Sequence, residues 1–414
     1  MSIQQSSKPK VIGSLENFAP VPPTMHILIC ALHRPSKPTG VCRHAANLAQ
    51  CLAESNQITQ VTLVVGAWQK AYFESSFNLQ SQKINLVSID IKNSSLSRNI
   101  WFLFGLPNLA KSLHPDIVHM SFPLPFYRSF FSCPVVATIH DLYPYECPEN
   151  FGFPQVLFNQ IFLKQCLYNS DGLSCVSKST LESLKFYFPK IEQNKKTTVI
   201  YNYVDFSNVE TKFPQKININ DSTSFILSVA QHRKNKNLDL LINSYYLLWK
   251  NGKIKDSTKL IIVGAPGHET NNILTQIKTL SLQQHVLIVS AIDDGELRWL
   301  YQNCELFVIP SSTEGFCLPL AEALYLSCKV VCSDIPIFKE IGSSDCTYFN
   351  LQNEPVENLS QAIFQCLEQP LAQESSVSSC LSKSNVAKRY LKFYSNFINN
   401  LKVKHELSAN KAKK

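Results

Sequence analysis

The sequence lacks several patterns that would each place a chain in a particular class. None of its 14 cysteines belongs to a Cys-x-x-Cys pair, and the closely spaced Cys328 and Cys332 have no matching second pair, which disfavours a zinc site. No uncharged apolar run approaches the roughly 20 residues that span a bilayer. Residues 1–18 also lack the apolar core of a signal peptide. We therefore expect a cytoplasmic protein, with peripheral contact at the inner face of the membrane as an option.

The chain is long enough for more than one domain, and its charge is only mildly unbalanced. Its 414 residues suit two or three domains of roughly 100–200 residues each. Lys and Arg exceed Asp and Glu by 39 to 31, a net charge of +8. A surplus this diffuse argues against a nucleic-acid partner and suits an anionic small substrate or a membrane surface, although a solvated basic surface explains it equally well. Cysteines scattered within apolar segments indicate a reducing compartment.

Short apolar runs alternate along the chain with segments of helical spacing. In the first half the runs lie at 26–31, 61–65, 84–89, 116–120, 134–139 and 197–201. The alternation restarts after a polar stretch at 212–224, with the runs SFILSV, KLIIVG, HVLIVS, ELFVIP and KVVCS. Apolar runs without polar alternation suit strands buried on both faces, and their alternation with helices argues for parallel sheets. The sequence therefore predicts two doubly wound α/β domains facing each other across a cleft, with ligands outside the carboxyl ends of the strands.

The stretch SSTEGFCLPLAEAL, Ser311–Leu324, follows the predicted strand ELFVIP and carries two carboxylates around an apolar turn. Pro319 suits the first turn of a helix, so the preceding GFCL turn would present backbone N–H groups at a helix N-terminus, where anions bind. Glu314 would lie on the loop and Glu322 in the first helical turn, where the helix dipole stabilises it by ~0.3–1 kcal/mol. Because sugar hydroxyls donate to carboxylates and phosphate accepts from amides, a diphosphate-linked sugar satisfies the whole arrangement. Glu322 alone is equally well explained as a helix-stabilising charge.

This stretch resembles the glutamate-x7-glutamate signature of the retaining glycosyltransferases of the GT-B fold, glycosyltransferase family 4 (glycosyl transferases group 1, mannosyltransferase-like). Further matches follow the family's order: SVAQHRKNKNLDLLINSY resembles its basic loop and following helix, KLIIVGAPG its nucleotide-domain strand and glycine turn, and KVVCSDIPIFKEIG the segment that ends in PEVxG. The resemblance is strong over 197–350 and weaker, though colinear, over 25–196. Near the end, SNVAKRYLKFYSNFI looks like the family's last helix, which crosses back onto the first domain.

The strand pattern and the resemblance together divide the chain into six parts. In order, we expect a flexible N-terminal segment at 1–24, an N-terminal acceptor-side Rossmann-like domain at 25–205, a linker at 206–222, a C-terminal nucleotide-sugar-binding Rossmann-like domain at 223–375, a crossing helix at 376–400 and a basic tail at 401–414.

The resemblance implies a donor site built mostly by the second domain. Lys236, with Arg233 as its basic neighbour, would neutralise the nucleotide diphosphate and the charge that develops on it as the leaving group, an effect that is often the largest in catalysis. Glu314 would contact hydroxyls of the donor sugar, and Glu322 would hold the nucleotide ribose. Lys236 and Glu314 are therefore predicted to act in catalysis as well as in donor binding.

The backbone also takes part in this implied site. The amides near the sugar or the phosphate would be those of Phe316, Cys317 and Leu318, and the base would lie against Val289–Ala291. No divalent metal is expected, because no Asp-x-Asp motif occurs at a strand end and Asp293–Asp294 opens a predicted helix, where it suits a cap. Basic side chains and helix dipoles would replace the metal. The nucleotide diphosphate sugar is then a donor substrate, and no cofactor is expected.

Two positions in the first domain are implied to face the same cleft. His140, in VVATIHDLYP, ends a predicted strand and would act in catalysis by meeting the donor sugar or its incoming acceptor, although a lone histidine is more often structural. Gly40, in KPTGVCRHAANL, stands where the family has a glycine-rich turn that opens the first helix and approaches the phosphates or the acceptor. Arg43 and His44 beside it are equally well explained as solvated side chains.

Four features depart from the family pattern, and one of them is that Gly40 lacks its usual glycine neighbour. Gln231 stands where the family has an arginine five residues before the lysine, and other side chains of the basic loop 232–236 would have to supply that charge. Cys317 replaces the second glycine of the turn, so the backbone must either avoid a positive φ there or carry strain. Tyr203 replaces the glycine of the family's NGV turn. Both carboxylates and the lysine are retained, so activity is expected.

Two stretches of the first domain are dense in aromatic residues. The segment 117–136, IVHMSFPLPFYRSFFSCPVV, holds five of them around a single arginine, and the segment 151–169, FGFPQVLFNQIFLKQCLYN, adds more. Core packing explains such stretches more often than membrane contact. Because the resemblance places the acceptor in this domain, a greasy and mildly basic face would suit a lipid-linked acceptor.

The leading interpretation is a retaining glycosyltransferase that moves a hexose of mannose or glucose type from a nucleotide diphosphate sugar to a saccharide or lipid-linked saccharide, in the assembly of a cell-surface polysaccharide. A nucleotide-sugar epimerase shares the two-domain fold, but the glutamate pair and the HRKNKN loop argue against it. Gln231 and Cys317 leave open a third interpretation, a non-catalytic nucleotide-binding subunit that supports a partner enzyme.

Overall fold

The structure, a computed structural model, describes residues 24–36, 39–77, 79–220, 222–290, 292–369 and 381–412. Of the predicted N-terminal segment 1–24 only residue 24 belongs to this set, and of the predicted tail 401–414 only helical backbone up to residue 412 does. Within these ranges, none of the helices combines the length and the apolarity that a bilayer-spanning segment requires.

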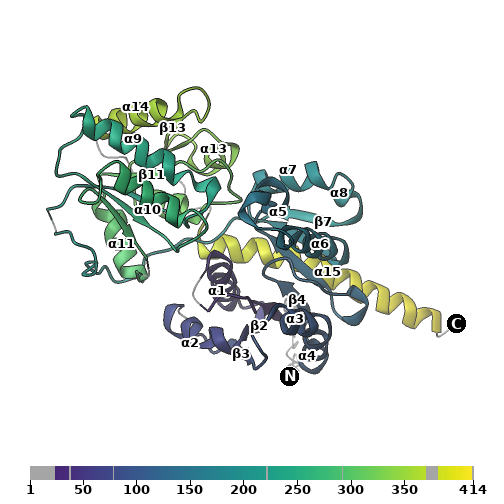
Figure 1. The fold of residues 1–414 in the computed structure, drawn as a ribbon. Helices are drawn as coiled ribbons and strands as arrows, with labels where there is room; N and C mark the ends of the chain where they lie inside the picture. The colour runs from purple at the N-terminus through teal and green to yellow at the C-terminus, as the bar shows by residue number, and fades with distance from the viewer. Residues whose placement is uncertain are drawn as a thin grey trace, which may run out of the picture.

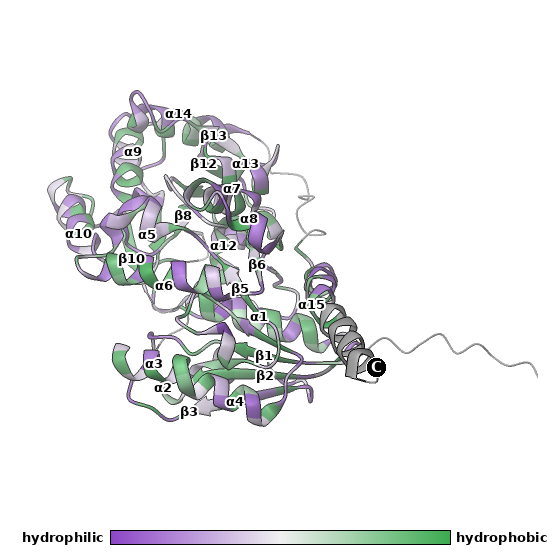
Figure 2. Ribbon diagram, turned by 90° about the vertical axis from the view of Figure 1, so that its right-hand side faces the viewer, coloured by the Kyte–Doolittle hydropathy of each residue, from purple (hydrophilic) through white to green (hydrophobic). Residues whose placement is uncertain are grey.

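The N-terminal domain is built on a parallel sheet. Within the described residues it has seven strands, in the spatial order β3-β2-β1-β4-β5-β6-β7. They are β1 (Met25–Cys30), β2 (Ile58–Gly66), β3 (Ile84–Ile89), β4 (Ile117–Met120), β5 (Val135–Ile139), β6 (Gly172–Cys175) and β7 (Lys196–Val199). Each adjacent pair runs parallel, and the apolar strands β1 and β2 are mainly green in Figure 2.

Helices cover both faces of this sheet. They are α1 (Gly40–Ala53), α2 (Ala67–Ser76), α3 (Ser95–Ile100) with its π-helical continuation η1 (Trp101–Gly105), α4 (Leu106–Leu113), η2 (Arg128–Phe130), α5 (Tyr143–Glu146), η3 (Pro148–Asn150), α6 (Gln155–Asn169), α7 (Lys178–Tyr187), α8 (Ile191–Asn194) and the last helix of the chain, α15 (Lys383–Ala412). Successive strand residues point to opposite faces. Ile27 and Ile29 of β1 accordingly join a core cluster with α1 and α15. Leu28 and Cys30 join a second cluster with α4 and α6.

The C-terminal domain repeats this construction. Its described residues form a six-stranded parallel sheet in the order β10-β9-β8-β11-β12-β13. The strands are β8 (Phe225–Val229), β9 (Lys259–Val263), β10 (Val286–Val289), β11 (Leu306–Ile309), β12 (Val330–Ser333) and β13 (Thr347–Phe349). The helices are η4 (Lys234–Lys236), α9 (Leu238–Lys250), α10 (Thr270–Thr279), α11 (Asp294–Asn303), α12 (Leu318–Tyr325), α13 (Pro336–Gly342) and α14 (Pro355–Glu368).

Each sheet reverses its winding direction beside its first strand. β8 lies between β9 and β11, and β1 lies between β2 and β4. A crevice opens at such a switch point, outside the carboxyl ends of the strands, and it is the usual ligand site of this architecture. The predicted pair of doubly wound α/β domains is confirmed.

Helix α15 leaves the C-terminal domain and packs along the N-terminal one, as the yellow ribbon in Figure 1 shows. Tyr390 and Tyr394 are fully buried in the core cluster of α1. The Tyr394 hydroxyl lies 2.6 Å from Nδ1 of His119 in β4, which fixes the helix to the centre of the sheet. The predicted crossing helix is confirmed. Its predicted range was 376–400, of which 376–380 lie outside the described residues.

Candidate active site

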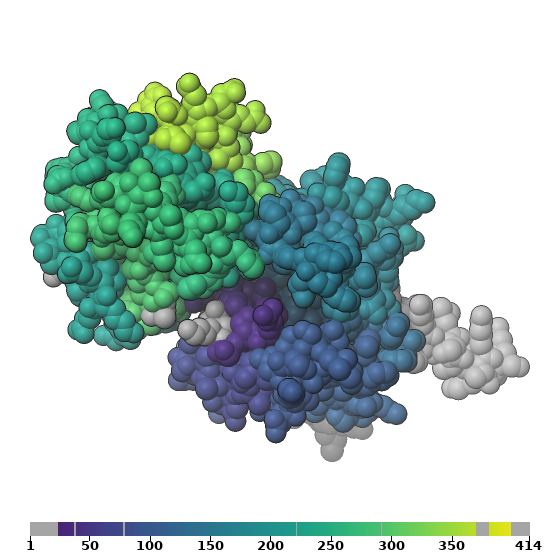
Figure 3. Space-filling view, viewed as in Figure 1, coloured from purple at the N-terminus to yellow at the C-terminus, as the bar shows by residue number. Residues whose placement is uncertain are grey.

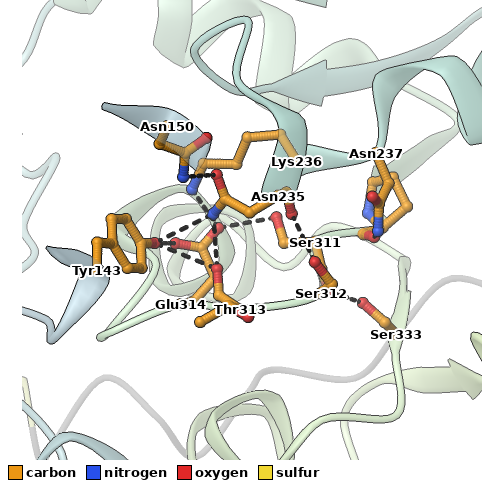
Figure 4. Close-up of polar contacts among 11 residues, drawn as sticks. Tyr143, Asn150, Asn235, Lys236, Asn237, Ser311, Ser312, Thr313, Glu314 and Ser333 are labelled. Carbon is orange, nitrogen blue, oxygen red and sulfur yellow. Dashed lines mark hydrogen bonds and ion pairs between the residues drawn. The ribbon is translucent and has the colours of Figure 1, made fainter. Parts of the chain in front are cut away.

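Two charged side chains meet just outside the carboxyl ends of the adjacent switch-point strands of the C-terminal domain. Lys236 ends η4 after β8, and Glu314 lies on the loop after β11. Lys236 Nζ lies 2.5 Å from Glu314 Oε1, and the two side chains are 14% and 6% exposed. Ser311 Oγ donates to the same oxygen at 2.8 Å, while the Tyr143 hydroxyl, from α5 of the other domain, donates to Oε2 at 3.1 Å. The structure thus brings the two predicted residues together (Figure 4), and their low exposure shields them from water.

The N-terminal domain grips the loop that carries this carboxylate. Ser177 Oγ and Thr180 Oγ1 donate to the carbonyl of Gly315 at 2.6 and 2.9 Å. A Cβ on Gly315 would lie 1.7 Å from the carbonyl oxygen of His140. Only a glycine permits so close an approach of two backbones. The two domains are therefore closed on each other at this loop.

His140, the first residue after β5, is held in one tautomer at the domain contact. Its Nε2 lies 2.7 Å from the carbonyl oxygen of Ser121, which can only accept, so Nε2 carries a proton. Burial lowers the pKa of His140 to about 4. The ring is therefore neutral at pH 7, with Nδ1 as its acceptor atom. The ring of His44 packs edge-on against it with centroids 4.7 Å apart, and since His44 is only 5% exposed, its interpretation as a solvated side chain is wrong.

Asp141, to which the sequence analysis assigned no role, places a carboxyl beside the predicted cations. Burial raises the pKa of Asp141 to about 6, although the Tyr143 N–H, which donates to it at 3.1 Å, and the charges of Arg233 and Lys236 lower it. Arg233 and Lys236 of the C-terminal domain therefore lie near enough to lower the pKa of this carboxyl, which belongs to the N-terminal domain. Its one sequence signal was its position after His140 at a strand end.

The basic loop after β8 divides into buried and accessible side chains. His232 is 1% exposed, and its Nδ1 lies 3.0 Å from Thr270 Oγ1. It is therefore a packed residue and cannot supply the charge that Gln231 lacks. Arg233 is half-buried and Lys234 is exposed. These two remain as candidates, and Arg233 is the one whose charge reaches Asp141.

Glu322 lies apart from Glu314, in a cavity of about 190 Å³ where the two domains meet. The Tyr301 hydroxyl donates to Glu322 Oε2 at 3.0 Å. Burial raises the pKa of Glu322, and the charge of Arg43 opposes that rise. Leu318 lines the same cavity, with residues of α1, the linker and α11. The predicted donor residues are thus divided between this cavity and the domain contact around Glu314. The molecule is hollowed along the domain junction (Figure 3).

The turn that leads into α12 has an unusual backbone. The helix begins at Leu318 with Pro319 in its first turn, as predicted. Cys317, buried like Phe316, has φ 66° and ψ 76°, so the chain carries the left-handed strain of a missing glycine, on the order of 1–3 kcal/mol. Glu322 is the fifth residue of α12 and lies in its second turn. Its predicted position in the first turn is wrong, and the helix dipole adds little there because its effect falls off within one turn.

An ion pair crosses the domain boundary at the same cavity. Arg43 of α1 donates from Nη1 and Nη2 to the two carboxylate oxygens of Asp294 at 2.9 and 2.6 Å. The interpretation of Arg43 as a solvated side chain is therefore wrong. The predicted cap is confirmed for Asp293, whose Oδ1 accepts from the Glu296 N–H at 2.9 Å, while the Glu296 carboxylate accepts from the Asp293 N–H at 2.9 Å.

Three further positions named from the sequence lie around this junction. Gly40 begins α1, and a Cβ there would meet Leu318 Cδ1 at an ordinary 4.0 Å, so this contact does not require a glycine. Tyr203 lines the cavity and donates its hydroxyl to Asp205 at 2.8 Å. Val289 ends β10, but Ala291 lies outside the described residues. In the part of the chain that the structure describes, no group of three or more His, Cys, Asp or Glu side chains is placed to hold a metal ion.

Comparison with known proteins matches each half of the chain to a domain model. Residues 38–208 match Glycosyltransferase Family 4, and residues 209–378 match Glycosyl transferases group 1. The chain is 26% identical over 325 residues to the O-antigen chain mannosyltransferase RfbU of Salmonella typhimurium, which covers 76% of this chain and 84% of that protein. Over 174 residues, 42% of this chain and 44% of the other, it is 36% identical to the N-acetylgalactosamine-N,N'-diacetylbacillosaminyl-diphospho-undecaprenol 4-alpha-N-acetylgalactosaminyltransferase of Campylobacter jejuni. A glycosyltransferase structure from Rickettsia africae, 17% identical, aligns with a TM-score of 0.64 over 91% of this chain and 99% of that one.

Proposed function

This chain belongs to the GT-B glycosyltransferases that join a Glycosyltransferase Family 4 domain to a Glycosyl transferases group 1 domain, and we propose that it transfers a hexose from a nucleotide diphosphate sugar to a saccharide or lipid-linked saccharide with retention of configuration. RfbU is named for the O-antigen chain, which supports a role in cell-surface polysaccharide synthesis. The Campylobacter relative is named for a diphospho-undecaprenol acceptor, which supports a lipid-linked acceptor. Because RfbU is named a mannosyltransferase, mannose is the first hexose to test.

The shielded Lys236–Glu314 pair at the carboxyl ends of β8 and β11 is the observation that carries this proposal. A departing diphosphate needs positive charge beside it, and Lys236 with Arg233 supplies that charge from the C-terminal domain. Glu314 offers carboxylate oxygen to the sugar hydroxyls. Glu322, in the adjoining cavity, offers its carboxylate oxygens to the hydroxyls of the nucleotide ribose. Since fixed cations act on the leaving group, we propose that transfer requires no divalent metal and no cofactor.

His140 completes the proposed site from the N-terminal domain. Its neutral ring presents Nδ1 as an acceptor, because Nε2 donates to the backbone of Ser121. A neutral acceptor at the domain contact suits a hydroxyl of the donor sugar or of the incoming acceptor. The low pKa keeps the ring in this form across the neutral range.

An exposed apolar face on the N-terminal domain supports a membrane-bound acceptor. We call it the apolar face, and its exposed side chains are Leu96, Ile100 and Phe104 on α3–η1, Tyr127 and Phe130 at η2, and Leu157, Phe158, Ile161 and Tyr168 on α6. The first three recur at every fourth residue and so form one stripe of a helix. The Phe104 and Phe130 rings lie 6.1 Å apart, and the Arg128 N–H donates to the Asn169 side chain at 3.2 Å. These two contacts place α3–η1 beside η2, and η2 beside the C-terminal end of α6.

The charge on the apolar face is mildly positive. The segments that build it, 95–113, 117–139 and 151–170, contain four cationic residues, Arg98, Lys111, Arg128 and Lys164, and neither Asp nor Glu. Arg98 is buried and Arg128 is paired with Asp171 at 2.6 Å, so the exposed cations of these segments are Lys111 and Lys164. A contiguous exposed apolar patch marks an interaction surface, and surrounding positive charge suits anionic lipid headgroups. We propose that this face rests on the inner surface of the membrane and that the lipid-linked acceptor enters the domain cleft from there.

Turnover tests the proposed function. The wild type and the Lys236→Ala variant are incubated with UDP-glucose, UDP-galactose or GDP-mannose, with and without a bacterial lipid extract as acceptor, and release of the nucleoside diphosphate is followed. We expect one donor to be consumed by the wild type at least 100-fold faster than by the variant. The anomeric signal of the product then reports retention. Nucleotide binding without any turnover would instead favour the non-catalytic subunit.

A further inference from the structure

We propose that Tyr143 is a positioning residue that orients the carboxylate of Glu314 and does so only when the two domains are closed. Its hydroxyl donates to Glu314 Oε2 at 3.1 Å from the opposite domain. Lys236 and Ser311 hold the other oxygen, Oε1, at 2.5 and 2.8 Å, and both belong to the same domain as Glu314. The C-terminal domain thus fixes one end of the carboxylate, and the N-terminal domain fixes the other.

This arrangement limits what Glu314 can still accept. An ionised carboxylate has about four acceptor positions, two on each oxygen. Lys236 and Ser311 occupy the positions on Oε1, and Tyr143 occupies one on Oε2. A single position on Oε2 is left for a sugar hydroxyl, and its direction is set by the Tyr143 hydrogen bond. Tyr143 therefore determines which hydroxyl of the donor sugar the carboxylate meets.

Tyr143 is itself held by contacts from both domains. Its side chain is 6% exposed, its own N–H donates to Asp141, and its hydroxyl lies 3.2 Å from the carbonyl oxygen of Thr313. Asn235 Nδ2 donates to the same carbonyl at 2.9 Å and lies 3.4 Å from the Tyr143 hydroxyl. Burial raises the pKa of Tyr143, so the hydroxyl keeps the proton that it donates. Figure 4 shows Tyr143, Asn235 and Thr313 around the Glu314 carboxylate.

A second contact across the boundary secures the same network. Asn150 of η3 donates from Nδ2 to Asn235 Oδ1 at 3.1 Å, and the two side chains are 8% and 3% exposed. Tyr143 and Asn150 come from the N-terminal domain, whereas Asn235, Thr313 and Glu314 come from the C-terminal one. Separation of the domains breaks every one of these bonds between them. Closure over the donor and correct orientation of Glu314 are consequently the same event.

This inference rests on the proposed role of Glu314 in binding the donor sugar, and it predicts a sugar-dependent defect. The variant Tyr143→Phe removes one hydroxyl and keeps the buried ring. The nucleotide is proposed to bind through Glu322 and the basic loop, so its affinity is expected to stay within twofold of wild type. Affinity for the intact donor is expected to fall about tenfold, the usual effect of losing a hydrogen bond to a charged group. The turnover number should fall with it.

The experiment measures dissociation constants for UDP, UDP-glucose, GDP and GDP-mannose on the wild type, Tyr143→Phe and Tyr245→Phe. Tyr245 is a matched control, because its buried hydroxyl donates to the Thr258 carbonyl at 2.6 Å within the C-terminal domain. In Tyr143→Phe we expect a loss of affinity only for the sugar nucleotides. In Tyr245→Phe we expect unchanged affinity for the nucleotides and for the sugar nucleotides.

Three results would overturn the inference. An equal loss for nucleotide and sugar nucleotide would show a merely structural role, and unchanged affinities with unchanged turnover would show no role. A wild type that binds none of the four ligands would overturn the proposed function itself. If Tyr143→Phe does not fold, Asn150→Ser weakens the same network without changing a group bonded to Glu314. A loss of affinity confined to the sugar nucleotide would then support the inference, and an equal loss for nucleotide and sugar nucleotide would overturn it.

Discussion

Gly315 approaches His140 so closely across the domain boundary that a Cβ on the glycine would lie 1.7 Å from the histidine carbonyl oxygen. The two residues belong to the loop of Glu314 and to the end of β5, so the contact joins the proposed sugar-binding carboxylate to the N-terminal domain. Closure of the enzyme consequently depends on the absence of one side chain.

The variant Gly315→Ala is expected to hold the domains apart. The added methyl meets backbone rather than a movable side chain, so the closed contact cannot form without a shift of the loop. We expect transfer activity to fall at least 100-fold, because a misplaced catalytic group costs about that much. Small-angle scattering should show a larger radius of gyration. Gly152→Ala is the control, because a Cβ there meets nothing within 4 Å, and activity in Gly315→Ala equal to that control would refute the prediction.

Removal of Lys236 alone should affect stability as well as activity. Lys236→Met leaves Glu314, 6% exposed, without its cation, and an unpaired buried charge costs about 3 kcal/mol. Urea unfolding should show most of that loss, and the double variant Lys236→Met/Glu314→Gln should recover much of it while staying inactive. A double variant as unstable as the single one would show that the unpaired charge of Glu314 does not cause the loss of stability in Lys236→Met.

The raised pKa of Asp141 predicts a pH-dependent stability. The carboxyl ionises at about 6 in the folded protein and at 3.8 in the reference state. Well below pH 3.8 the carboxyl is protonated in both states. As the pH rises from about 4 to about 6 the unfolded chain loses this proton while the folded protein keeps it, so stability falls by up to about 3 kcal/mol and then stays level above about pH 6.

The variant Asp141→Asn has no carboxyl to ionise and so lacks this loss of stability. The free energy of unfolding of the variant and of the wild type is measured in urea at pH 4.5 and 7.5. The variant should gain stability relative to the wild type as the pH rises between these values. The difference between the two proteins also cancels the opposite trend of His140, whose lowered pKa makes the fold more stable as pH rises from about 4 to 6.5. A difference that does not change with pH would contradict the assignment.

Membrane contact through the apolar face is tested by vesicle flotation. The variant Phe104→Ser/Phe130→Ser removes two adjacent exposed rings, 55% and 47% exposed, so the fold should be kept. With vesicles containing phosphatidylglycerol, we expect binding to weaken at least tenfold, since each buried aromatic ring contributes about 1.5–3 kcal/mol. Leu274→Ser, which removes a 49% exposed residue of α10 in the other domain, should bind like the wild type. A wild type that fails to float with these vesicles would disprove the contact.

Much of the fold was predictable from the sequence because parallel strands buried on both faces leave uninterrupted apolar runs. The crossing helix, and Lys236 and Glu314 as members of one site, were reached through the resemblance of the motifs, whereas the ion pair between the two residues was not predicted. For Cys317 the sequence left two possibilities, a backbone without positive φ or a strained left-handed one, because the residue type alone does not determine φ. The position of Glu322 within α12 was missed by one turn, because sequence patterns locate the start of a helix only approximately.

Contacts between the two domains were beyond sequence reasoning. Arg43 and Asp294 lie 251 positions apart in the chain, and no local pattern indicates that they pair. Tyr143 reads as an ordinary core residue in a short helix, yet its hydroxyl reaches a carboxylate of the other domain. The aromatic stretch 117–136 contains both kinds of residue, since Phe126 is fully buried while Phe130 is 47% exposed, and composition alone cannot separate a core from a surface.

Thermal stability with and without nucleotides tests the central claim most directly. The wild type, Glu322→Ala and the exposed control Glu357→Ala are heated with UDP, GDP and their sugars at about 100 times the dissociation constant, where binding adds about 2.7 kcal/mol. The account predicts that one nucleotide series raises the melting temperature of the wild type and of Glu357→Ala by a few degrees, and that Glu322→Ala loses most of that shift. If no nucleotide shifts the wild type, or if Glu322→Ala keeps the full shift, the domain junction is not the donor site.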